Sequence, residues 1–437
     1  MQSAIWAAVA GAFLLGVEDQ RTLKVLGDRK SVEEGGFWIY NDLPRALDRA
    51  RETGKPVLVV IRCIPCEACA QLDAQVVQRD PAVQKLLDKF VCVRIINANG
   101  LDLSLFQYDY DQSFAAFFLN ADKTIYGRYG TRSHETESAQ DVSVEGFARS
   151  LEAALKLHEQ YPANKQALAA KRGPEPKVKS PEQFPSLKEK YGSKLAESGN
   201  VAASCIHCHQ VGEALRRLYR DEGEPIPDRV MFPYPMPNIL GLTMDPKQAA
   251  SILEVAADSP AERSGFRSGD QIVSLAGQPL VSTADIQWVL HHGPASGELK
   301  AEVRREGQTL VLPLALENGW RRRGDLSWRA SSWDLRRMAF GGMRLRSVTT
   351  EERSQLGLAK DAPALWIKHV GQYGDHAAAK RAGFLKDDVL VELEGQPVPA
   401  SETELLAALI ASKKPGQRLP AVVLRGGKRV ELEMPVQ

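Results

Sequence analysis

Residues 55–77 read KPVLVVIRCIPCEACAQLDAQVV, and they set the fold class of the first third of the chain. The run PVLVVI is short and continuously apolar, which is typical of a strand buried on both faces. Cys63, Cys66 and Cys69 follow it at once. Thiols at a strand-to-helix turn gain from the dipole of the helix N-terminus, which stabilises a reactive thiolate. The stretch therefore predicts a buried strand that leads into a cysteine centre at a helix start.

Two further apolar runs of strand length lie downstream, FVCVRII at 90–96 and FAAFFLN at 114–120. A segment with helical spacing of its apolar residues, at 146–160, closes the region. This order of elements predicts an α/β domain over residues 37–160, and the domain resembles the thioredoxin-like fold. Cys92, inside the first of these runs, is expected to be a buried apolar residue.

The thioredoxin-like resemblance implies roles for the three clustered cysteines. Cys66 would be the nucleophile and Cys69 the resolving thiol, with Cys63 as an extra. In the thioredoxin-like family a cis-proline orients substrate and keeps metals off the thiols. This chain has Phe114 at the corresponding position. Three interpretations of Cys63, Cys66 and Cys69 therefore stay open. They form a thiol–disulfide centre of unusual specificity, they bind a metal or cluster, or they have only a structural role.

The pentapeptide CIHCH at 205–209 is the second chemical motif of the chain. Two thiols three residues apart can reach both vinyl groups of one haem, and the histidine that follows can bind the iron. The motif predicts covalent haem c at Cys205 and Cys208, with His209 as the proximal ligand. A zinc site is the alternative, but zinc needs further ligands, and residues 210–260 contain neither cysteine nor histidine.

The segment around this motif, residues 186–237, resembles a truncated class I cytochrome c. The resemblance implies an axial methionine downstream, and Met231, Met236 and Met244 are available. Met236 is the choice, because its context PMPN is similar to the ligand loop of many such cytochromes. The spacings are short for the family, so a five-coordinate iron and a histidine from elsewhere stay open as alternatives. Each methionine could equally fill a core.

Residues 238–437 contain an internal repeat with a constant offset of 118 residues. Ala261, Gly265 and Asp270 recur as Ala379, Gly383 and Asp388, and the tripeptide Gly-Gln-Pro recurs at 277 and 395. One duplicated fold accounts for these matches. Thr283 and its counterpart Ser401 each stand just before a short amphipathic helix and suit its N-cap.

Each copy resembles a PDZ domain of bacterial type, over 238–318 and 339–437. The resemblance implies a β-rich α+β domain that adds an extended peptide to a sheet edge. Backbone N–H groups would hold the C-terminal carboxylate of that peptide, and the capped helix would form one wall of the groove. The carboxylate-binding loops would lie at Leu240-Gly241-Leu242 and at Gly342-Met343. A degenerate copy used only for packing is the alternative.

Two segments are expected to link these domains. Residues 161–185 are rich in Lys, Pro and Ala without an apolar period, which indicates a linker. Residues 319–338 contain Trp320, Trp328 and Trp333 among arginines. We expect a linker whose tryptophans pack on the flanking domains. An Arg–Trp surface that binds a partner through cation–π pairs is the alternative.

Composition narrows the class of partner. Lys and Arg number 56 against 55 acidic residues, for a formal net charge of +1, so no strong field favours nucleic acid or an acidic membrane surface. The apolar run at 4–17 suits a signal peptide or an N-terminal anchor over residues 1–18, with a short buried helix as the alternative. We expect no other membrane-embedded part.

Together these patterns predict a periplasmic or secreted multidomain protein, with or without a membrane anchor. It would combine an α/β thioredoxin-like domain, a small α-helical cytochrome c-like segment and two β-rich PDZ-like domains, which resembles multidomain proteins of planctomycete type. The expected function is electron transfer between the cysteine centre and haem c, with a redox partner protein and a peptide or protein held by the PDZ grooves. A PDZ scaffold with a redox-sensing haem and a metal-handling protein are the alternatives. No Gly-x-Ser-x-Gly or comparable nucleophile context appears, which argues against a protease.

Overall fold

The computed structural model describes residues 20–62, 81–112, 114–133, 140–196 and 201–437. The expected signal peptide or anchor at 1–18 lies outside these ranges, and so do Cys63, Cys66 and Cys69. Within the described ranges, no helix has the length and apolar character that crossing a membrane would require. The chain forms two compact units, each described here by itself: one contains Met1–Ala214 with Pro233–Trp320, and the other contains Leu215–Phe232 with Arg321–Gln437.

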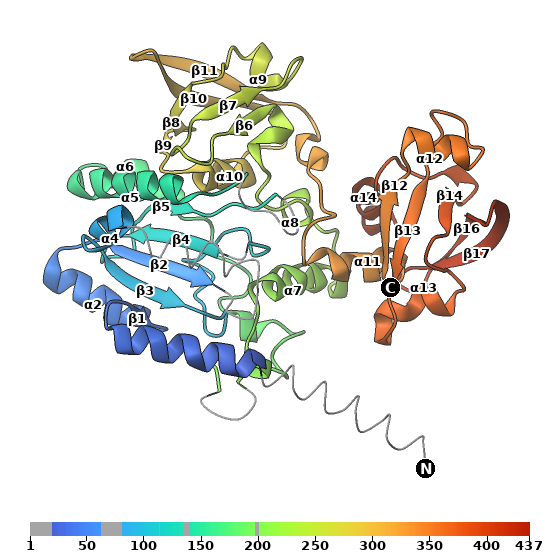
Figure 1. Ribbon diagram of the computed structural model, residues 1–437, viewed down its shortest axis with the longest axis horizontal. Helices are drawn as coiled ribbons and strands as arrows, with labels where there is room; N and C mark the ends of the chain where they lie inside the picture. Colours follow the sequence, from blue (N-terminus) through green and yellow to red (C-terminus); the bar gives the residue numbers. More distant parts are fainter. Residues whose placement is uncertain (1–19, 63–80, 113, 134–139, 197–200) are drawn as a thin grey trace. The chain divides into compact units, whose positions relative to one another are not determined.

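A five-stranded sheet forms the centre of the thioredoxin-like region, in the order β1-β3-β2-β4-β5 (Figure 1). β1, β3 and β2 run parallel to one another, whereas β4 and β5 are antiparallel additions. All six residues of β2 are buried, which confirms the strand predicted from the apolar run. The strands are β1 (Ile39–Tyr40), β2 (Val57–Arg62), β3 (Val91–Ile95), β4 (Phe114–Leu119) and β5 (Ile125–Tyr129).

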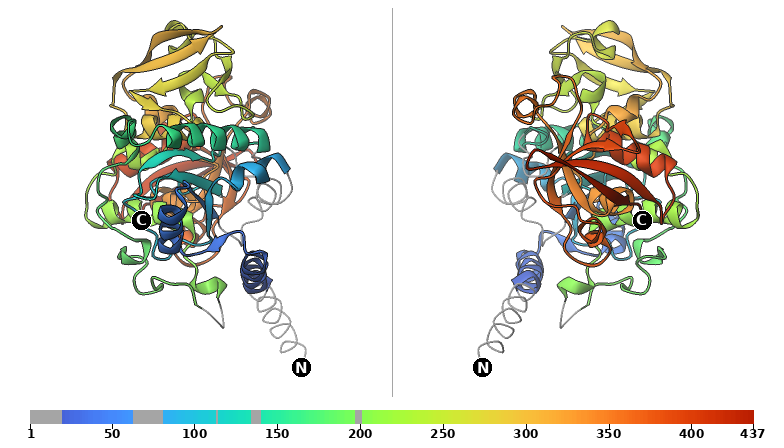
Figure 2. Two further views of the ribbon diagram at one scale, coloured as in Figure 1. Left: turned by 90° about the vertical axis from the view of Figure 1, so that its left-hand side faces the viewer. Right: turned by 90° about the vertical axis from the view of Figure 1, so that its right-hand side faces the viewer.

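Helices pack on both faces of this sheet, with α2 (Leu43–Thr53) on one face and α5 (Val144–Glu159) on the other (Figure 1, Figure 2). A further helix, α4 (Pro81–Leu87), packs against α5, and residues 20–35 are helical. α5 begins at Ser143, whose side chain accepts a hydrogen bond from the Gly146 N–H as a helix cap. On the α4 and α5 side, these helices and the sheet enclose an apolar core, as expected of an α/β domain.

Residues 161–185, expected to be a linker, are folded against this domain. They form α6 (Lys165–Leu168), η1 (Ala169–Lys171) and η2 (Pro181–Gln183), and the Lys171 side chain is completely buried. Isolated buried residues hold the segment in place instead of a periodic apolar face, which is why its sequence reads as a linker. The chain continues through η3 (Ala202–Ser204), α7 (Cys208–Asp221), α8 (Asp228–Met231) and η4 (Pro237–Leu240).

The first PDZ-like copy consists of a two-stranded sheet, β6-β7, and a four-stranded sheet in the order β11-β10-β8-β9. Backbone hydrogen bonds from Ile252 to Asp270 and from Ile272 to Ala250 join the two sheets. Its elements are β6 (Leu242–Met244), β7 (Ile252–Val255), α9 (Pro260–Arg263), β8 (Gln271–Leu275), β9 (Gln278–Pro279), α10 (Thr283–His292), β10 (Gly297–Arg305) and β11 (Gln308–Leu316).

The second copy repeats this order of strands and helices in a single sheet, β12-β13-β14-β16-β17, with β15 paired to β14. The duplication predicted from the sequence is therefore present in the fold. An added helix, α12 (Thr350–Gln355), follows β12. The remaining elements are β12 (Met343–Ser347), β13 (Leu365–Val370), η6 (Gly374–Ala377), α13 (Ala378–Arg381), β14 (Val389–Leu393), β15 (Gln396–Pro397), α14 (Glu402–Ser412), β16 (Arg418–Arg425) and β17 (Lys428–Pro435).

The segment at 319–338 also differs from the expected linker, because it is helical and largely buried. It forms η5 (Trp320–Arg323) and most of α11 (Ser332–Phe340). Trp320 is completely buried and donates from its indole Nε1 to the Pro294 carbonyl at 3.1 Å, so this tryptophan packs on the first copy as predicted. Two buried arginines of the segment lie over the half-buried rings of Trp328 and Trp333 as cation–π pairs.

Candidate functional site

The CIHCH motif lies at the junction of η3 and α7. Cys205 is 4% exposed and Cys208 is 6% exposed, and both are reduced thiols. Cys205 directly follows η3, and Cys208 and His209 lie in the first turn of α7. The motif is thus enclosed by protein at its two thiols.

Asn99, in the loop after β3, joins the motif to the thioredoxin-like domain. Its side-chain Oδ1 accepts from the Ile206 N–H at 2.8 Å, and its Nδ2 donates to the Ser204 carbonyl at 3.0 Å. The Ala98 N–H donates to the Ile206 carbonyl at 2.9 Å. These bonds hold the backbone on both sides of Cys205, so the loop acts as a clamp on the first thiol.

The clamp stands at a particular edge of the sheet. β2 and β3 are parallel neighbours, with Ile61 opposite Ile95, so both strands end at the same edge. β2 ends at Arg62, and the next residue in the sequence is Cys63. The CIHCH motif therefore docks at the edge where the chain enters the three-cysteine segment. The sequence-predicted residues Cys63, Cys66 and Cys69 themselves lie outside the described residues.

Tyr108 binds the second thiol. Its hydroxyl donates to the Cys208 Sγ at 3.1 Å, and the tyrosine itself is buried. Its ring packs edge-on against Tyr110 and against Phe117 of β4, with ring centroids 4.7 Å and 5.8 Å away. No sequence pattern indicates this contact, because Tyr108 lies 100 residues before the cysteine that it binds.

Burial sets the protonation of the motif. It raises the pKa of Cys205 to about 12, with the adjacent Cys208 thiol as the second cause. Burial likewise lowers the pKa of His207 to about 4, and His209 and Arg21 add to that effect. Burial therefore favours the neutral thiol form of Cys205 at neutral pH. Among the described residues, no group of three potential metal-ligating side chains comes together.

Glu213 orients the histidine of the motif. His209 Nδ1 lies 3.0 Å from the Glu213 Oε1, one helical turn further along α7. A carboxylate on one ring nitrogen fixes the ring of a metal-binding histidine and makes the other nitrogen a better ligand. Two thiols and an imidazole held in this way form a donor set that fits a covalently attached haem. Glu213 was missed in the sequence, although the i,i+4 spacing on a helix could have found it.

The three candidate axial methionines occupy different places. Met231 is 3% exposed and belongs to the apolar core of the second unit. Met244 is 8% exposed and belongs to the core of the first PDZ-like copy. Met236 is half-buried at the start of η4, and it stays the predicted sixth ligand. Filling a core is thus the observed role of two of the three residues.

The two predicted carboxylate-binding loops have equivalent backbones. Gly241 has a φ of 92° and Gly342 a φ of 87°, which glycine adopts without strain. The carbonyl of Gly241 accepts from the Ala256 N–H, and that of Gly342 accepts from the Gly371 N–H. Each loop leads into a strand at the end of its sheet order, β6 or β12. Leu240, Leu242 and Met343 beside these glycines are all buried.

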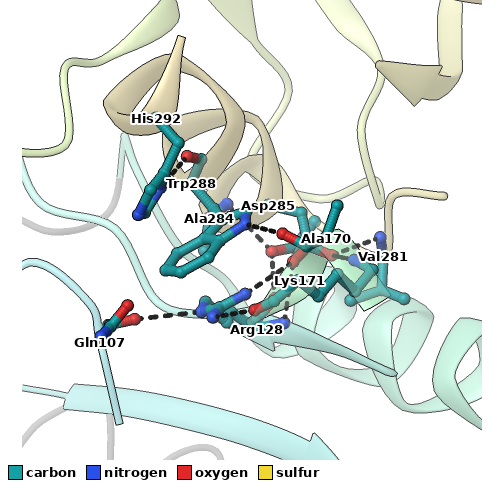
Figure 3. A network of polar contacts seen from close by, with 10 residues as sticks. Gln107, Arg128, Ala170, Lys171, Val281, Ala284, Asp285, Trp288 and His292 are labelled. Atoms are coloured by element: carbon teal, nitrogen blue, oxygen red, sulfur yellow. Dashed lines mark hydrogen bonds and ion pairs between the residues drawn. The ribbon is translucent and has the colours of Figure 1, made fainter. Parts of the chain in front are cut away.

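A buried charge network, drawn in Figure 3, joins α10 of the first copy to the thioredoxin-like domain. Lys171 Nζ lies 2.9 Å from Asp285 Oδ2, and the Arg128 N–H donates to Asp285 Oδ1 at 3.2 Å. The Arg128 guanidinium lies 3.7 Å above the Trp288 ring, and the Trp288 indole donates to the Ala170 carbonyl at 3.0 Å. Burial lowers the pKa of Lys171, and the Asp285 carboxylate opposes that shift.

This network was not predicted, because Lys171 lies in the expected linker and Arg128 on a strand. All three charged side chains are at most 3% exposed. The geometry shows that the helix expected to form a groove wall is, in this copy, a contact surface for another domain.

Two family models match the chain: residues 38–121 match the thioredoxin-like family, and residues 239–316 match the PDZ domain. Among curated relatives, the chain is 27% identical to a probable periplasmic serine endoprotease DegP-like of Pseudomonas savastanoi pv. phaseolicola, over 42% of this chain and 37% of the relative. It is 38% identical to the serine protease Do-like HtrB of Bacillus subtilis over 18% of each chain. The chain thus spans little more than a third of the first of these relatives.

Solved structures give local similarity. The HtrA3 PDZ domain bound to a phage-derived ligand (FGRWV) is 36% identical over 15% of this chain and 58% of that chain, with a TM-score of 0.14. The HtrA-type protease AlgW with a tripeptide is 28% identical over 21% of this chain and 29% of that chain, with a TM-score of 0.19. The family matches identify a multidomain, mixed α/β chain that contains a thioredoxin-like domain and a PDZ domain.

Proposed function

We propose that this chain is a redox protein of the periplasm or cell exterior that carries a covalent haem c beside a thioredoxin-like cysteine centre. The observation that supports it best is the clamp of Asn99 on the CIHCH backbone. That clamp holds the motif at the sheet edge where β2 and β3 end. The periplasmic location in the names of the DegP-like relatives supports a site of action outside the cytoplasm.

In this proposal Cys205 and Cys208 would hold the haem through thioether bonds, and His209 would bind its iron. Glu213 keeps the His209 ring oriented through Nδ1, and Tyr108 keeps the Cys208 sulfur in place. When bound, the haem supplies one-electron redox chemistry, and burial of its attachment site raises the effect of nearby charges on its potential. The haem segment and the cysteine centre share one polypeptide, which gives each a high effective concentration at the other.

The partners follow from the domains. Cys66 and Cys69, with Cys63 beside them, are the proposed dithiol; its oxidation to a disulfide would release two protons and two electrons, and these electrons would pass to the haem one at a time. A second redox protein completes the chain of transfer. The loop Leu240-Gly241-Leu242 is the proposed site for the carboxylate of a partner peptide, because solved HtrA-type relatives are bound to peptides. Residues 1–18 would direct export or anchor the protein.

A pyridine haemochrome spectrum of the full chain, made together with the c-haem maturation system, tests the haem. We expect one covalent haem per chain in the wild type and none in Cys208→Ala. Cys92→Ala is the matched control, since that thiol is buried on β3, 3.7 Å from the Leu87 carbonyl. Absence of covalent haem from the wild type would contradict the proposal.

Stopped flow tests the coupling. On reduction of the dithiol, the Soret and α bands of the haem should change in the wild type but not in Cys66→Ser. If dithiol reduction never changes these bands, the two centres are not coupled, even where the haem is attached.

A further inference from the structure

The helix α11 lies against both walls of the expected peptide groove of the second PDZ-like copy. It contacts β12, the strand at the end of the sheet, and α14, the capped helix. Leu335, Met338 and Phe340 of α11 are at most 1% exposed, and they share one apolar core with Leu405 and Leu406 of α14. An apolar helix face packed on these two elements occupies the place where a PDZ domain receives a peptide.

A buried ion pair also blocks the hydrogen bonding of a peptide backbone to β12 in this groove. Glu402, the first residue of α14, accepts from the Leu345 N–H of β12 at 2.7 Å. Arg336 of α11 donates to both oxygens of that carboxylate, at 3.0 Å and 2.7 Å, and Arg336 and Glu402 are 1% and 3% exposed. A peptide strand added to β12 needs the N–H groups that face away from β13. One of these groups is already bonded, and its partner is tied to α11.

Both ends of α11 are anchored within the same unit. Before the helix, the Leu326 N–H donates to the Thr403 Oγ1 at 2.9 Å. At its far end, the Gln437 N–H donates to the Met338 carbonyl at 2.8 Å. The Arg216 guanidinium also donates to the Ser331 Oγ at 2.6 Å beside the start of the helix.

We infer that α11 is the resident occupant of the second PDZ-like groove, so that this copy takes up a peptide only when α11 is displaced. The ligand that would replace it is an extended peptide with an apolar last residue and a free carboxylate, held at Gly342-Met343. The inference is independent of the haem and of the redox function, because every contact that carries it lies within the second unit.

Hydrogen exchange of the full chain tests this occupancy directly. The probe is a decapeptide that ends in Phe-Val with a free carboxylate, and its amidated form is the control. In the wild type we expect slow exchange across 332–347, unchanged by either peptide. Leu335→Asp with Met338→Asp should speed exchange in α11 on the order of 100-fold, because two charges would have to be buried. β14 and β16 should stay protected.

In that variant the free-carboxylate peptide should bind and slow exchange at 343–347, whereas the amidated peptide should not. Leu385→Asp is the matched control, since it places a charge at an apolar residue of the same copy that is already 49% exposed. Exchange at 343–347 that slows with peptide in the wild type, while α11 stays protected, would overturn the inference. So would loss of protection in β14 and β16 of the double variant, or its failure to bind the peptide.

Discussion

The two PDZ-like copies share a frame and differ at the start of one helix. In both, an arginine at the end of a long strand makes a bidentate ion pair with a buried aspartate and also donates to a glycine carbonyl. The pairs are Arg305 with Asp270 and Arg425 with Asp388. The helix that precedes this strand carries Ala284-Asp285 in the first copy and Glu402-Thr403 in the second.

The buried carboxylate of this helix therefore lies one aligned position earlier in the second copy than in the first, and it contacts a different part of the chain. Asp285 of α10 faces the thioredoxin-like domain, where Lys171 and Arg128 lie. Glu402 of α14 faces α11 and β12 of its own copy. The shared fold therefore accommodates a buried carboxylate at either position of the helix. The position of that carboxylate decides which part of the chain packs against the helix. The helices α10 and α14 both pack against another part of the chain, through different buried ion pairs.

Removing the first carboxylate should have the largest effect. Asp285→Ala leaves Lys171 and Arg128 buried without their counter-ion. Breaking a buried pair in this way costs about 3–5 kcal/mol, and we expect the upper end because two cations lose the same partner. Urea unfolding followed by tryptophan fluorescence, with Trp288 as the local reporter, measures the change.

The control for this variant is Glu254→Ala, an exposed acid on β7 of the same copy, which should change stability by less than about 0.5 kcal/mol. Adding Lys171→Met to Asp285→Ala should recover part of the loss, because an apolar residue of similar length does not need a counter-ion. A loss below about 1 kcal/mol for Asp285→Ala would mean that the network does not hold the domains together.

Removing the second carboxylate should cost slightly less. Glu402→Ala leaves one buried cation, Arg336, and the Leu345 N–H without their acceptor, for an expected loss of about 3 kcal/mol. Glu402→Gln keeps an acceptor for the N–H and should lose less. Unfolding of the second unit, followed by hydrogen exchange in β14 and β16, reports the difference. Equal losses for both variants would show that the charge has no part in holding α11.

Weakening the shared Arg–Asp ion pair should lower the free energy of unfolding of both copies. Asp270→Asn and Asp388→Asn each weaken two charged hydrogen bonds, for an expected loss of about 1.5–3 kcal/mol. The first copy should lose more, because the Arg305 side chain is 20% exposed while that of Arg425 is 35% exposed. Denaturant midpoints of the two single variants measure this. A larger loss in the second copy would contradict the common frame.

The secondary structure and the internal repeat could be predicted from the sequence, whereas the ion pairs that join α10 and α14 to other parts of the chain could not. The buried strand β2 and the internal repeat follow from an apolar run and an offset of 118. The predicted cap of α14, Ser401, is confirmed, whereas the predicted cap of α10 is wrong, because Ser282 caps that helix and Thr283 is its first residue. These are local patterns. Asp285 with Lys171, and Glu402 with Arg336, join residues 114 and 66 positions apart, and no periodicity encodes such pairs.

The candidate site shows the same division. The motif CIHCH and its expected chemistry are visible in five residues, and haem attachment there stays a prediction. Asn99 and Tyr108, which hold Cys205 and Cys208 in place, come from a loop with no motif of its own. Sequence patterns therefore identify which residues carry the chemistry, whereas the residues that position them emerge only from the fold.

The smallest predicted effect is a difference in pH dependence between the wild type and Lys171→Met. Burial lowers the folded-state pKa of Lys171 below its ordinary value of 10.5, with Asp285 opposing. Between the lowered pKa and 10.5 the unfolded chain binds more protons than the folded protein, so the free energy of unfolding contributed by Lys171 rises with pH. Methionine cannot titrate, and it keeps most of the side-chain volume.

Stability of the wild type relative to Lys171→Met should therefore increase as pH rises toward 10.5. The expected gain is about 1.4 kcal/mol for each unit by which the pKa is lowered. Urea unfolding of both proteins at several pH values from 7 to about 10.5 measures this difference, and titrating groups common to both cancel in it. Parallel curves would show that Asp285 compensates the burial of Lys171 completely.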